Sequence, residues 1–446
     1  MKNFFKFIGI VFVGGVLIVG WNNSARGETL QDAIKYMLQT NPEIKTISYN
    51  RLARDQEVTQ AKSGYFPTLD VSYGVGRDWQ RKPFHDTSWP KSTVLSLRQN
   101  VFQFGVTKGE VNRQKARVRS EAYLLQGTSE NIALQASKVY LNVLRNLELH
   151  ELAKENLTNH ERIYDQMNLR RESGVDSKAD LDQVMGRLAL AQNNIVVTNA
   201  NIVDAKTDYQ FVVGRLPEDL IKPQTMSSSI PASLEEAEQL AVKNHPILKS
   251  AQADLEAREE QHRVAKRICF PSFDISADYR WQDDVNDNNG FNGYQEEFIA
   301  MGMVSFNIFK GWRDKGRICE TMYLISEAQE IFNSTQREVV QSIGLSWEAY
   351  KAAQDRVTHL EEYVKSSQLT AEAFAKQWSI GRRTMFDVLD TQAEYINACS
   401  DLVKAQYDKM YAECRILSGM GELTHTLSLQ WPEESSVVET VKKDAS

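Results

Sequence analysis

An internal duplication constrains the fold more than any other feature of this 446-residue chain. Five segments of the first half recur 204 positions later: Leu30, Asn41-Pro42, Ala61-Lys62, Phe66-Pro67 and Asp70-Val71-Ser72 return as Leu234, His245-Pro246, Ala265-Lys266, Phe270-Pro271 and Asp274-Ile275-Ser276. The offset then becomes 207 and pairs Gly109 with Gly316, Gly174 with Gly381, Asp180 with Asp387, and Gly214 with Gly421. A fixed offset predicts two copies of one supersecondary unit. The proline- and serine-rich segment from Gly214 to Ser233 separates them.

Each half is predicted to form a helix, two strands, a long helix, a turn and a helix. The strands are expected at 68–79, 92–102, 272–281 and 297–308. Two of them alternate between an apolar and a polar face: Leu69, Val71, Tyr73, Val75 and Trp79 oppose Asp70, Ser72, Gly74 and Asp78, while Phe273, Ile275, Ala277, Tyr279 and Trp281 oppose Ser272, Asp274, Ser276, Asp278 and Arg280. Alternation alone fits both a soluble sandwich and membrane strands.

The N-terminus favours the membrane alternative. Lys2 and Lys6 precede an apolar run over 7–19, and Ala25-Arg26-Gly27 supplies small residues for a cleavage site, so 1–27 is predicted to be a signal peptide. The alternative is a retained anchor, but the run is short for a bilayer span. Strands of about ten residues with aromatic ends suit an outer-membrane barrel. Four strands cannot close one, so the barrel must be shared between chains. The loops at 82–89 and 283–293 are expected at its solvent-exposed end.

The helices are too long for a globular core. The segment 107–171 contains no proline and predicts a rod of about 95 Å. Its counterpart, 312–379, carries a coiled-coil seam of mostly small residues: Ile325, Ala328, Phe332, Thr335, Val339, Ser342, Ser346, Ala349 and Ala353. The helices expected at 30–65, 179–213, 234–269 and 384–417 have about half that length, so two of them stacked end to end should match one rod.

The turns that end the rods have matched capping signals. Gly174 and Gly381 can adopt the left-handed conformation that ends a helix. Ser177 with Asp180, and Thr384 with Asp387, have the spacing of a capping box at the next helix start. Each half should therefore contain a helical hairpin.

Charge and motifs exclude several functions. Removing residues 1–27 takes away three basic residues and no acid, which changes the net charge from −7 to −10 and disfavours a nucleic-acid partner. Cys269, Cys319, Cys399 and Cys414 lack CxxC spacing and the histidines lack i, i+4 pairing, so no metal and no cofactor is expected. Buried free thiols are favoured for the cysteines, with a disulfide as the alternative. No catalytic motif indicates an enzyme, and Gly74-Val75-Gly76 falls within a strand.

Over residues 30–423 the chain resembles the TolC-type outer-membrane efflux proteins. The duplicated element order carries the resemblance, together with Gly64-Tyr65-Phe66-Pro67, Cys269-Phe270-Pro271 and Val388-Leu389-Asp390-Thr391-Gln392. It implies a mainly α fold with a membrane β-barrel portion: a homotrimer whose twelve-stranded barrel continues as a long helical tunnel, with an equatorial collar. The division is then signal peptide 1–27, first repeat 28–213, linker 214–233, second repeat 234–423 and tail 424–446. The tail is short for this family.

The resemblance also implies a function. The expected protein is a passive exit duct in the outer membrane of a Gram-negative bacterium, extending into the periplasm and embedded in outer-membrane lipid. Its partners would be a periplasmic adaptor protein and an inner-membrane ABC or proton-driven exporter, in efflux or type I secretion. The alternative is a structural coiled-coil protein of the cell envelope without transport activity, which would not require two amphipathic strand hairpins.

Five site residues follow from the same resemblance. It implies that Asp387 and Asp390 line a channel constriction, where six carboxylates of a trimer surround the axis and repulsion raises their proton affinity. The residues alone favour a cap at Asp387 and a solvated Asp390. The resemblance also implies that Asp180, Trp378 and Arg383 link the two hairpins within and between chains and hold the channel closed. Trp378 stands where the family often has tyrosine, and the alternative for Arg383 is a solvated side chain.

Overall fold

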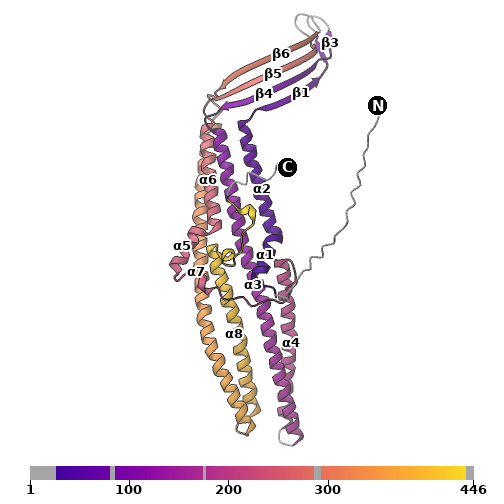
Figure 1. Ribbon diagram of the computed structural model, residues 1–446, viewed down its shortest axis with the longest axis vertical. Coiled ribbons are helices and arrows are strands. Elements are labelled where there is room, and N and C mark those ends of the chain that lie inside the picture. Colours follow the sequence, from indigo (N-terminus) through magenta and orange to yellow (C-terminus); the bar gives the residue numbers. More distant parts are fainter. Residues whose placement is uncertain (1–26, 81–85, 174–176, 286–292, 438–446) are drawn as a thin grey trace, which may run out of the picture.

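The computed structural model describes residues 27–80, 86–173, 177–285 and 293–437. The molecule is elongated, with a sheet at one end, long helices along its length and two helical tips at the other end (Figure 1). The predicted signal peptide, apart from Gly27, lies outside the described residues.

The order of the elements repeats along the chain, as the duplication predicts. The first half contains α1 (Leu30–Thr40), α2 (Pro42–Lys62), β1 (Thr68–Val75), β4 (Lys91–Phe102), α3 (Val106–Glu172) and α4 (Lys178–Val213). The second contains α5 (Leu234–Asn244), α6 (Pro246–Arg267), β5 (Ser272–Val285), β6 (Gly293–Ser305), α7 (Arg313–Ser379) and α8 (Met385–Met420). The remaining elements are short: β2 (Asp78–Gln80), β3 (Asp86–Ser88), α9 (Leu423–Thr426), η1 (Ser63–Tyr65), η2 (Ser227–Ser229) and η3 (Glu433–Ser435).

The helices predicted at 30–65 and 234–269 are each broken in two, so that prediction is wrong. The breaks fall at Asn41 and His245, directly before Pro42 and Pro246. Proline lacks an N–H and disfavours the helical conformation in the preceding residue, so each proline starts a new helix. The Asn41 side chain caps α2, whereas His245 makes no side-chain cap on α6.

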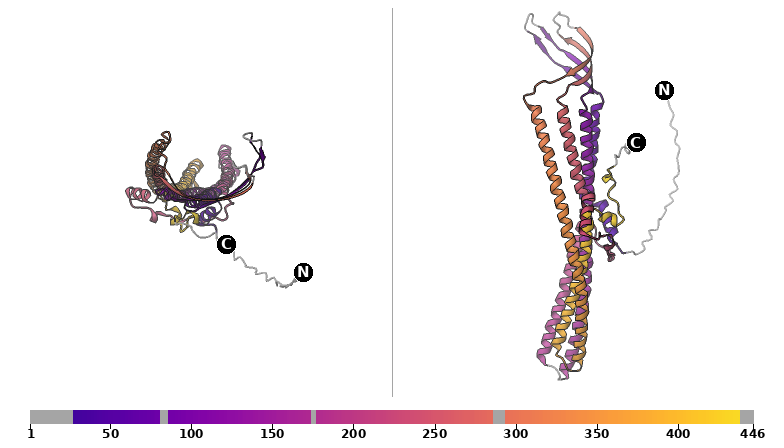
Figure 2. Two further views of the ribbon diagram at one scale, coloured as in Figure 1. Left: turned by 90° about the horizontal axis from the view of Figure 1, so that it is seen from above. Right: turned by 90° about the vertical axis from the view of Figure 1, so that its left-hand side faces the viewer.

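Two 67-residue helices, α3 and α7, form the predicted rods and span about 100 Å each. The shorter helices pack along them end to end, as predicted: α2 and α6 near the sheet, α4 and α8 toward the tips (Figures 1 and 2). The α7 seam is buried at Ala328, Val339 and Ser346, but Ser342 is exposed and its neighbour Ile343 is buried instead.

The main sheet is antiparallel, with strand order β1-β4-β5-β6. Its register places Val71, Leu95, Tyr279 and Phe298 in one row across the four strands. The adjacent row on the opposite face contains Asp70, Ser96, Asp278 and Ile299, and the Ser96 hydroxyl donates to Asp278 at 2.6 Å. The predicted apolar and polar faces are therefore present, although β6 contributes an apolar residue to the polar face.

Three strand predictions require correction. The strand expected at 272–281 continues to Val285 as β5. The strand expected at 68–79 ends at Val75, and Trp79 lies in β2, which pairs with β3 in a separate small sheet, so Trp79 does not continue the apolar row. The strand expected at 297–308 runs from Gly293 to Ser305, because pairing with the longer β5 extends to Val285 opposite Gly293. The predicted loops shorten accordingly, and 81–85 and 286–292 lie outside the described residues.

Within the described chain, each outer strand of this sheet has one partner: β1 pairs with β4, and β6 pairs with β5. Viewed along the long axis, the sheet and the helices beneath it form an arc (Figure 2). The apolar row remains exposed, with Val71 at 71% and Phe298 at 67%. One chain therefore presents an incomplete, curved wall.

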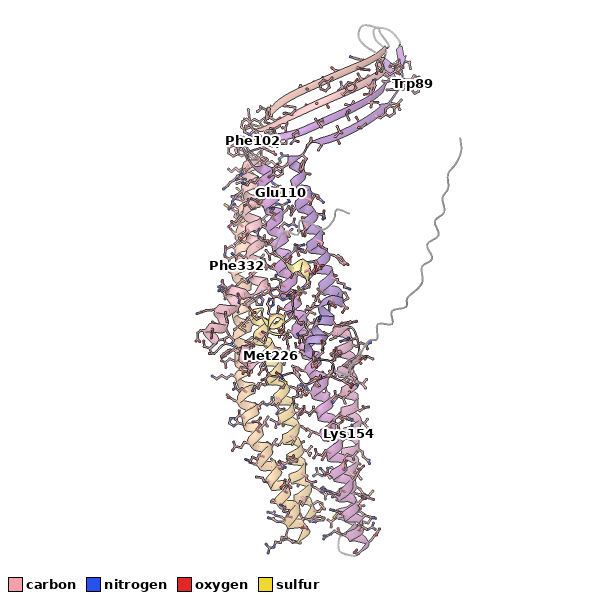
Figure 3. The ribbon with its side chains drawn as sticks, in the orientation of Figure 1. Trp89, Phe102, Glu110, Lys154, Met226 and Phe332 are labelled. Atoms are coloured by element: carbon pink, nitrogen blue, oxygen red, sulfur yellow. The ribbon has the colours of Figure 1, made fainter. Side chains whose placement is uncertain are left out.

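The main hydrophobic core lies at mid-height, where α1, α5 and the segments 214–233 and 421–437 surround the rods. We call these two segments the collar, and Met226 of the first segment is labelled in Figure 3. Gly127 of α3 lets α6 approach closely, since a Cβ there would lie 2.2 Å from a carbon of Ile247. Tyr140 in α3 is fully buried and its hydroxyl donates to the Ile221 carbonyl at 2.7 Å, which attaches the first collar segment to the rod.

A buried carboxylate holds the second collar segment. Glu130 of α3 is 2% exposed and accepts hydrogen bonds from the Leu423 N–H at 3.1 Å, the Thr424 N–H at 3.2 Å and the Trp431 indole N–H at 2.9 Å. Burial raises the pKa of Glu130, and these donors oppose the rise. Glu130 thus fixes the chain after Gly421 against the middle of α3.

Candidate functional site at the helical tips

Each hairpin tip is built around a capping box. The Ser177 hydroxyl donates to the Asp180 carboxylate at 2.7 Å and accepts from the Asp180 N–H at 3.2 Å. The Thr384 hydroxyl donates to Asp387 at 2.9 Å and accepts from its N–H at 3.3 Å. Both predicted capping boxes are confirmed, so α4 and α8 start at equivalent positions of the repeat.

The turn before α8 uses glycine as predicted. Gly381 has φ +76°, a conformation that side chains with a Cβ rarely adopt. The equivalent Gly174 lies outside the described residues.

A second hydrophobic cluster joins the two tips of one chain. It contains residues from α3, α4 and α8 that are all less than a tenth exposed, with Trp378 and Phe374 of α7 packed against it: Ile163, Met167, Leu181, Val184, Met385, Val388 and Leu389. We call this the tip cluster. Because all four helices contribute, the hairpins α3–α4 and α7–α8 share one apolar core near their ends.

Arg383 contacts its own hairpin. Its Nε donates to the Gln377 side chain at 3.1 Å, its guanidinium lies 4.1 Å from the Phe374 ring centroid, and an Nη lies 3.9 Å from Asp387. Asp180 is engaged in its own capping box. In the described part of a single chain, the predicted link between Arg383 and Asp180 is absent, because each side chain bonds locally. A link between neighbouring chains stays a prediction.

Trp378 does connect the hairpins, but through its ring. The Arg170 guanidinium of α3 lies 5.1 Å from the centroid of the Trp378 ring in α7. This is a cation–π contact, in which the face of the Trp378 ring meets the guanidinium of the other hairpin.

The two predicted constriction carboxylates have different environments. Hydrogen bonds from the Thr384 side chain and backbone lower the pKa of Asp387, and nearby Arg383 adds to the effect. Asp390 accepts a hydrogen bond from Arg187 Nη2 of α4 at 2.9 Å, although its side chain is 69% exposed. The expected rise in proton affinity concerns the assembled ring and stays a prediction.

Sequence reasoning missed Arg187 and Arg170. Arg187 and Asp390 are 203 positions apart in the chain, so neither helical spacing nor capping motifs connect them. The repeat gives no signal either, because the position 207 residues after Arg187 is Glu394, which is not its partner.

The structure also describes the thiols, the possible metal ligands and the possible membrane helices of the chain. All four cysteines are free thiols, but only Cys414 is buried as expected, and the other three are partly exposed. Among the residues that the structure describes, no group of three or more histidine, cysteine or acidic side chains is arranged to hold a metal ion. Within the same ranges, no helix is both long and apolar enough to cross a bilayer.

Comparison with known proteins identifies the family. The family model described as "Outer membrane efflux protein" matches residues 33–215 and 238–422. The chain is similar to the outer membrane efflux protein BepC of Brucella suis biovar 1, with 23% identity over 414 residues that cover 93% of this chain and 89% of the relative. It is also similar to the outer membrane protein TolC of Escherichia coli K12, with 24% identity over 434 residues, 92% of this chain and 85% of the relative.

A solved structure has the same fold. The CmeC outer membrane channel of Campylobacter jejuni matches with a TM-score of 0.78 at 14% identity, covering 92% of this chain and 90% of that one. Because the family model spans both repeats of the chain, this protein belongs to the outer membrane efflux protein family.

Proposed function

We propose that this protein is the outer-membrane exit duct of a tripartite efflux or type I secretion system and conducts substrate passively. The observation that carries the proposal is the curved sheet, whose two outer strands each have one partner within the described residues, mounted on rods of about 100 Å. Unpaired backbone groups are costly in lipid, so these edges require strands from other copies. The rods then extend the enclosed space away from the membrane.

The proposed assembly is a homotrimer with a twelve-stranded barrel. The exposed row that includes Val71 and Phe298 would face outer-membrane lipid, and the row that includes Asp70 and Asp278 would face the lumen. The proposed division of the chain remains 28–213 and 234–423 for the repeats, 214–233 for the linker and 424–446 for the tail.

The proposed partners are a periplasmic adaptor and an inner-membrane ABC or proton-driven exporter. The names of the relatives support this class of function, since BepC is an efflux protein and CmeC an outer membrane channel. A passive role fits the described residues of the tips and collar, which form helix caps, ion pairs and apolar clusters.

The tips would form the periplasmic mouth. We propose that Asp387 and Asp390 line its constriction, that Gly174 and Gly381 shape its turns, and that Asp180, Trp378 and Arg383 restrain it. The contacts of Arg383 with its own hairpin mean that any link to Asp180 would have to cross to a neighbouring chain.

Neighbouring positions of β1 provide a matched test of the membrane assembly. Val71→Arg places a charge on the row proposed to face lipid, at a cost of about 2–4 kcal/mol near the bilayer midplane. Ser72→Arg places the same charge on the opposite face. Heat-resistant trimers, extracted with detergent and counted by mass, should be depleted for Val71→Arg and retained for Ser72→Arg. A stable, water-soluble monomer would contradict the proposal.

Conductance separates the duct from a structural coiled-coil protein. The purified protein in a planar bilayer should give discrete ion-conducting channels, because a closed barrel leads into a tunnel. A trimer that inserts into the bilayer but never conducts would favour the structural alternative. This outcome should also be tested in the variant Asp180→Ala with Arg383→Ser, which is expected to open the mouth.

A further inference from the structure

The pair formed by Arg187 and Asp390 crosses between the two hairpins of a single chain. Arg187 belongs to α4 and Asp390 to α8, and Arg187 Nη2 donates to Asp390 Oδ1 at 2.9 Å. Arg187 is 37% exposed and Asp390 69% exposed, so the pair lies at the surface and its charges act on the surrounding solution.

The tip cluster fixes the position of this pair. Val184 lies one turn before Arg187 on α4, and Leu389 directly precedes Asp390 on α8; both are buried in the cluster. The contact between Arg170 and Trp378 joins α3 to α7 at the same end of the molecule. Arg187 is therefore held opposite Asp390 by packing that does not depend on the ion pair itself.

The charges of the mouth are consequently compensated within each chain. Asp387 has Arg383 at 3.9 Å, on the same helix start, and Asp390 has Arg187 from the other hairpin. An arginine side chain remains charged at all accessible pH values. A ring of carboxylates with an equal number of guanidinium groups beside it presents a much weaker field to passing ions than the carboxylates alone.

We propose that Arg187 is a selectivity-determining residue of the periplasmic mouth: by pairing with Asp390 in each chain, it removes about half of the acidic charge that the mouth presents to ions. This inference rests on the proposed function, because it requires the tips to line the conducting path.

The pair has little role in stability, which makes a substitution informative. Exposed ion pairs contribute little to folding, and Arg187 is not a member of the tip cluster, so we expect the cluster to persist when Arg187 is changed. The substitution therefore changes the field of the mouth while the fold persists.

The experiment compares channels in planar bilayers by two measurements: the concentration of La³⁺ that halves the current from the periplasmic side, and the reversal potential in a KCl gradient. In Arg187→Gln the half-blocking concentration should fall at least about tenfold, and the reversal potential should shift toward that of potassium. Arg187→Lys should behave like the unmodified protein.

Arg171→Gln is the matched control, because Arg171 is exposed at the end of α3 on the same hairpin and its loss removes an equal charge. It should change block by less than twofold. Exchange of the two charges, Arg187→Asp with Asp390→Arg, should restore block toward the unmodified value, which loss of structure would not do.

Unchanged block and reversal potential in Arg187→Gln, or an equal change in Arg171→Gln, would overturn the assignment while leaving the duct intact. An unmodified protein that forms no conducting channel would instead overturn the proposed function on which the assignment rests.

Discussion

The attachment of the C-terminal collar segment to α3 is testable through Glu130. Glu130→Ala removes the acceptor for three donors, the N–H groups of Leu423 and Thr424 and the indole N–H of Trp431. Leaving a buried donor without a partner costs about 1–3 kcal/mol. Removing the carboxylate also removes the cost of burying it, which offsets part of this loss. We therefore expect the free energy of local opening of the segment to fall by about 3 kcal/mol.

Hydrogen exchange measures this opening directly and does not require global unfolding of the protein. A change of about 3 kcal/mol corresponds to exchange about 100-fold faster. Peptides covering 422–437 in the detergent-solubilised protein should show this acceleration in Glu130→Ala, while peptides from α4 should exchange as before.

Two further variants make the result specific. Glu130→Gln keeps one oxygen acceptor and should give an intermediate acceleration. Glu433→Ala removes an exposed carboxylate from the same segment and should have no effect. If the segment exchanges equally slowly in Glu130→Ala and in the unmodified protein, the apolar core alone holds it and our account of Glu130 is wrong.

Three other predictions address the break between α5 and α6 and the mouth. Burial lowers the pKa of His245 from 6.5 to about 4. The contribution of the neutral imidazole to stability is therefore complete above pH 6.5 and is lost as the pH falls toward 4. The thermal midpoint should drop over that range, and the drop should be smaller in His245→Asn. Asp180→Ala with Arg383→Ser should increase the resting single-channel conductance, because three weak links add and a gate near balance shifts with a few kcal/mol; equal conductance would refute the gate. Asp387→Asn with Asp390→Asn should weaken block by multivalent cations, and unchanged block in bilayer recordings would count against the constriction.

The features predictable from the sequence are those with a local signal. The long rods follow from uninterrupted helical periodicity, and both capping boxes follow from residues three positions apart. The breaks before Pro42 and Pro246 also have a local signal, because proline disfavours the helical conformation in the residue before it. The end of β1 at Val75 coincides with Gly76, a residue that weakens strands.

The features that escaped prediction join distant parts of the chain. Glu130 meets the N–H of Thr424 across 294 positions, and Arg187 meets Asp390 across 203. Such partners are brought together by packing of whole helices, which no short motif encodes. The sequence did place Asp390 and Trp378 at the correct end of the molecule, but their contacts depend on how α3 and α4 lie against α7 and α8.

The duplication accounts for the caps at the tips but not for the ion pair that joins the two hairpins. Caps must be equivalent in both copies, and Asp180 matches Asp387 because each starts a helix in the same way. The pair of Arg187 and Asp390 has no such equivalent, because the position that matches Arg187 in the other repeat carries the opposite charge. Arg187 corresponds to Glu394, whose carboxylate accepts from the Tyr363 hydroxyl of α7 at 2.9 Å within its own hairpin. The attraction between α4 and α8 therefore depends on residues that differ between the two repeats, and the duplication alone does not predict it.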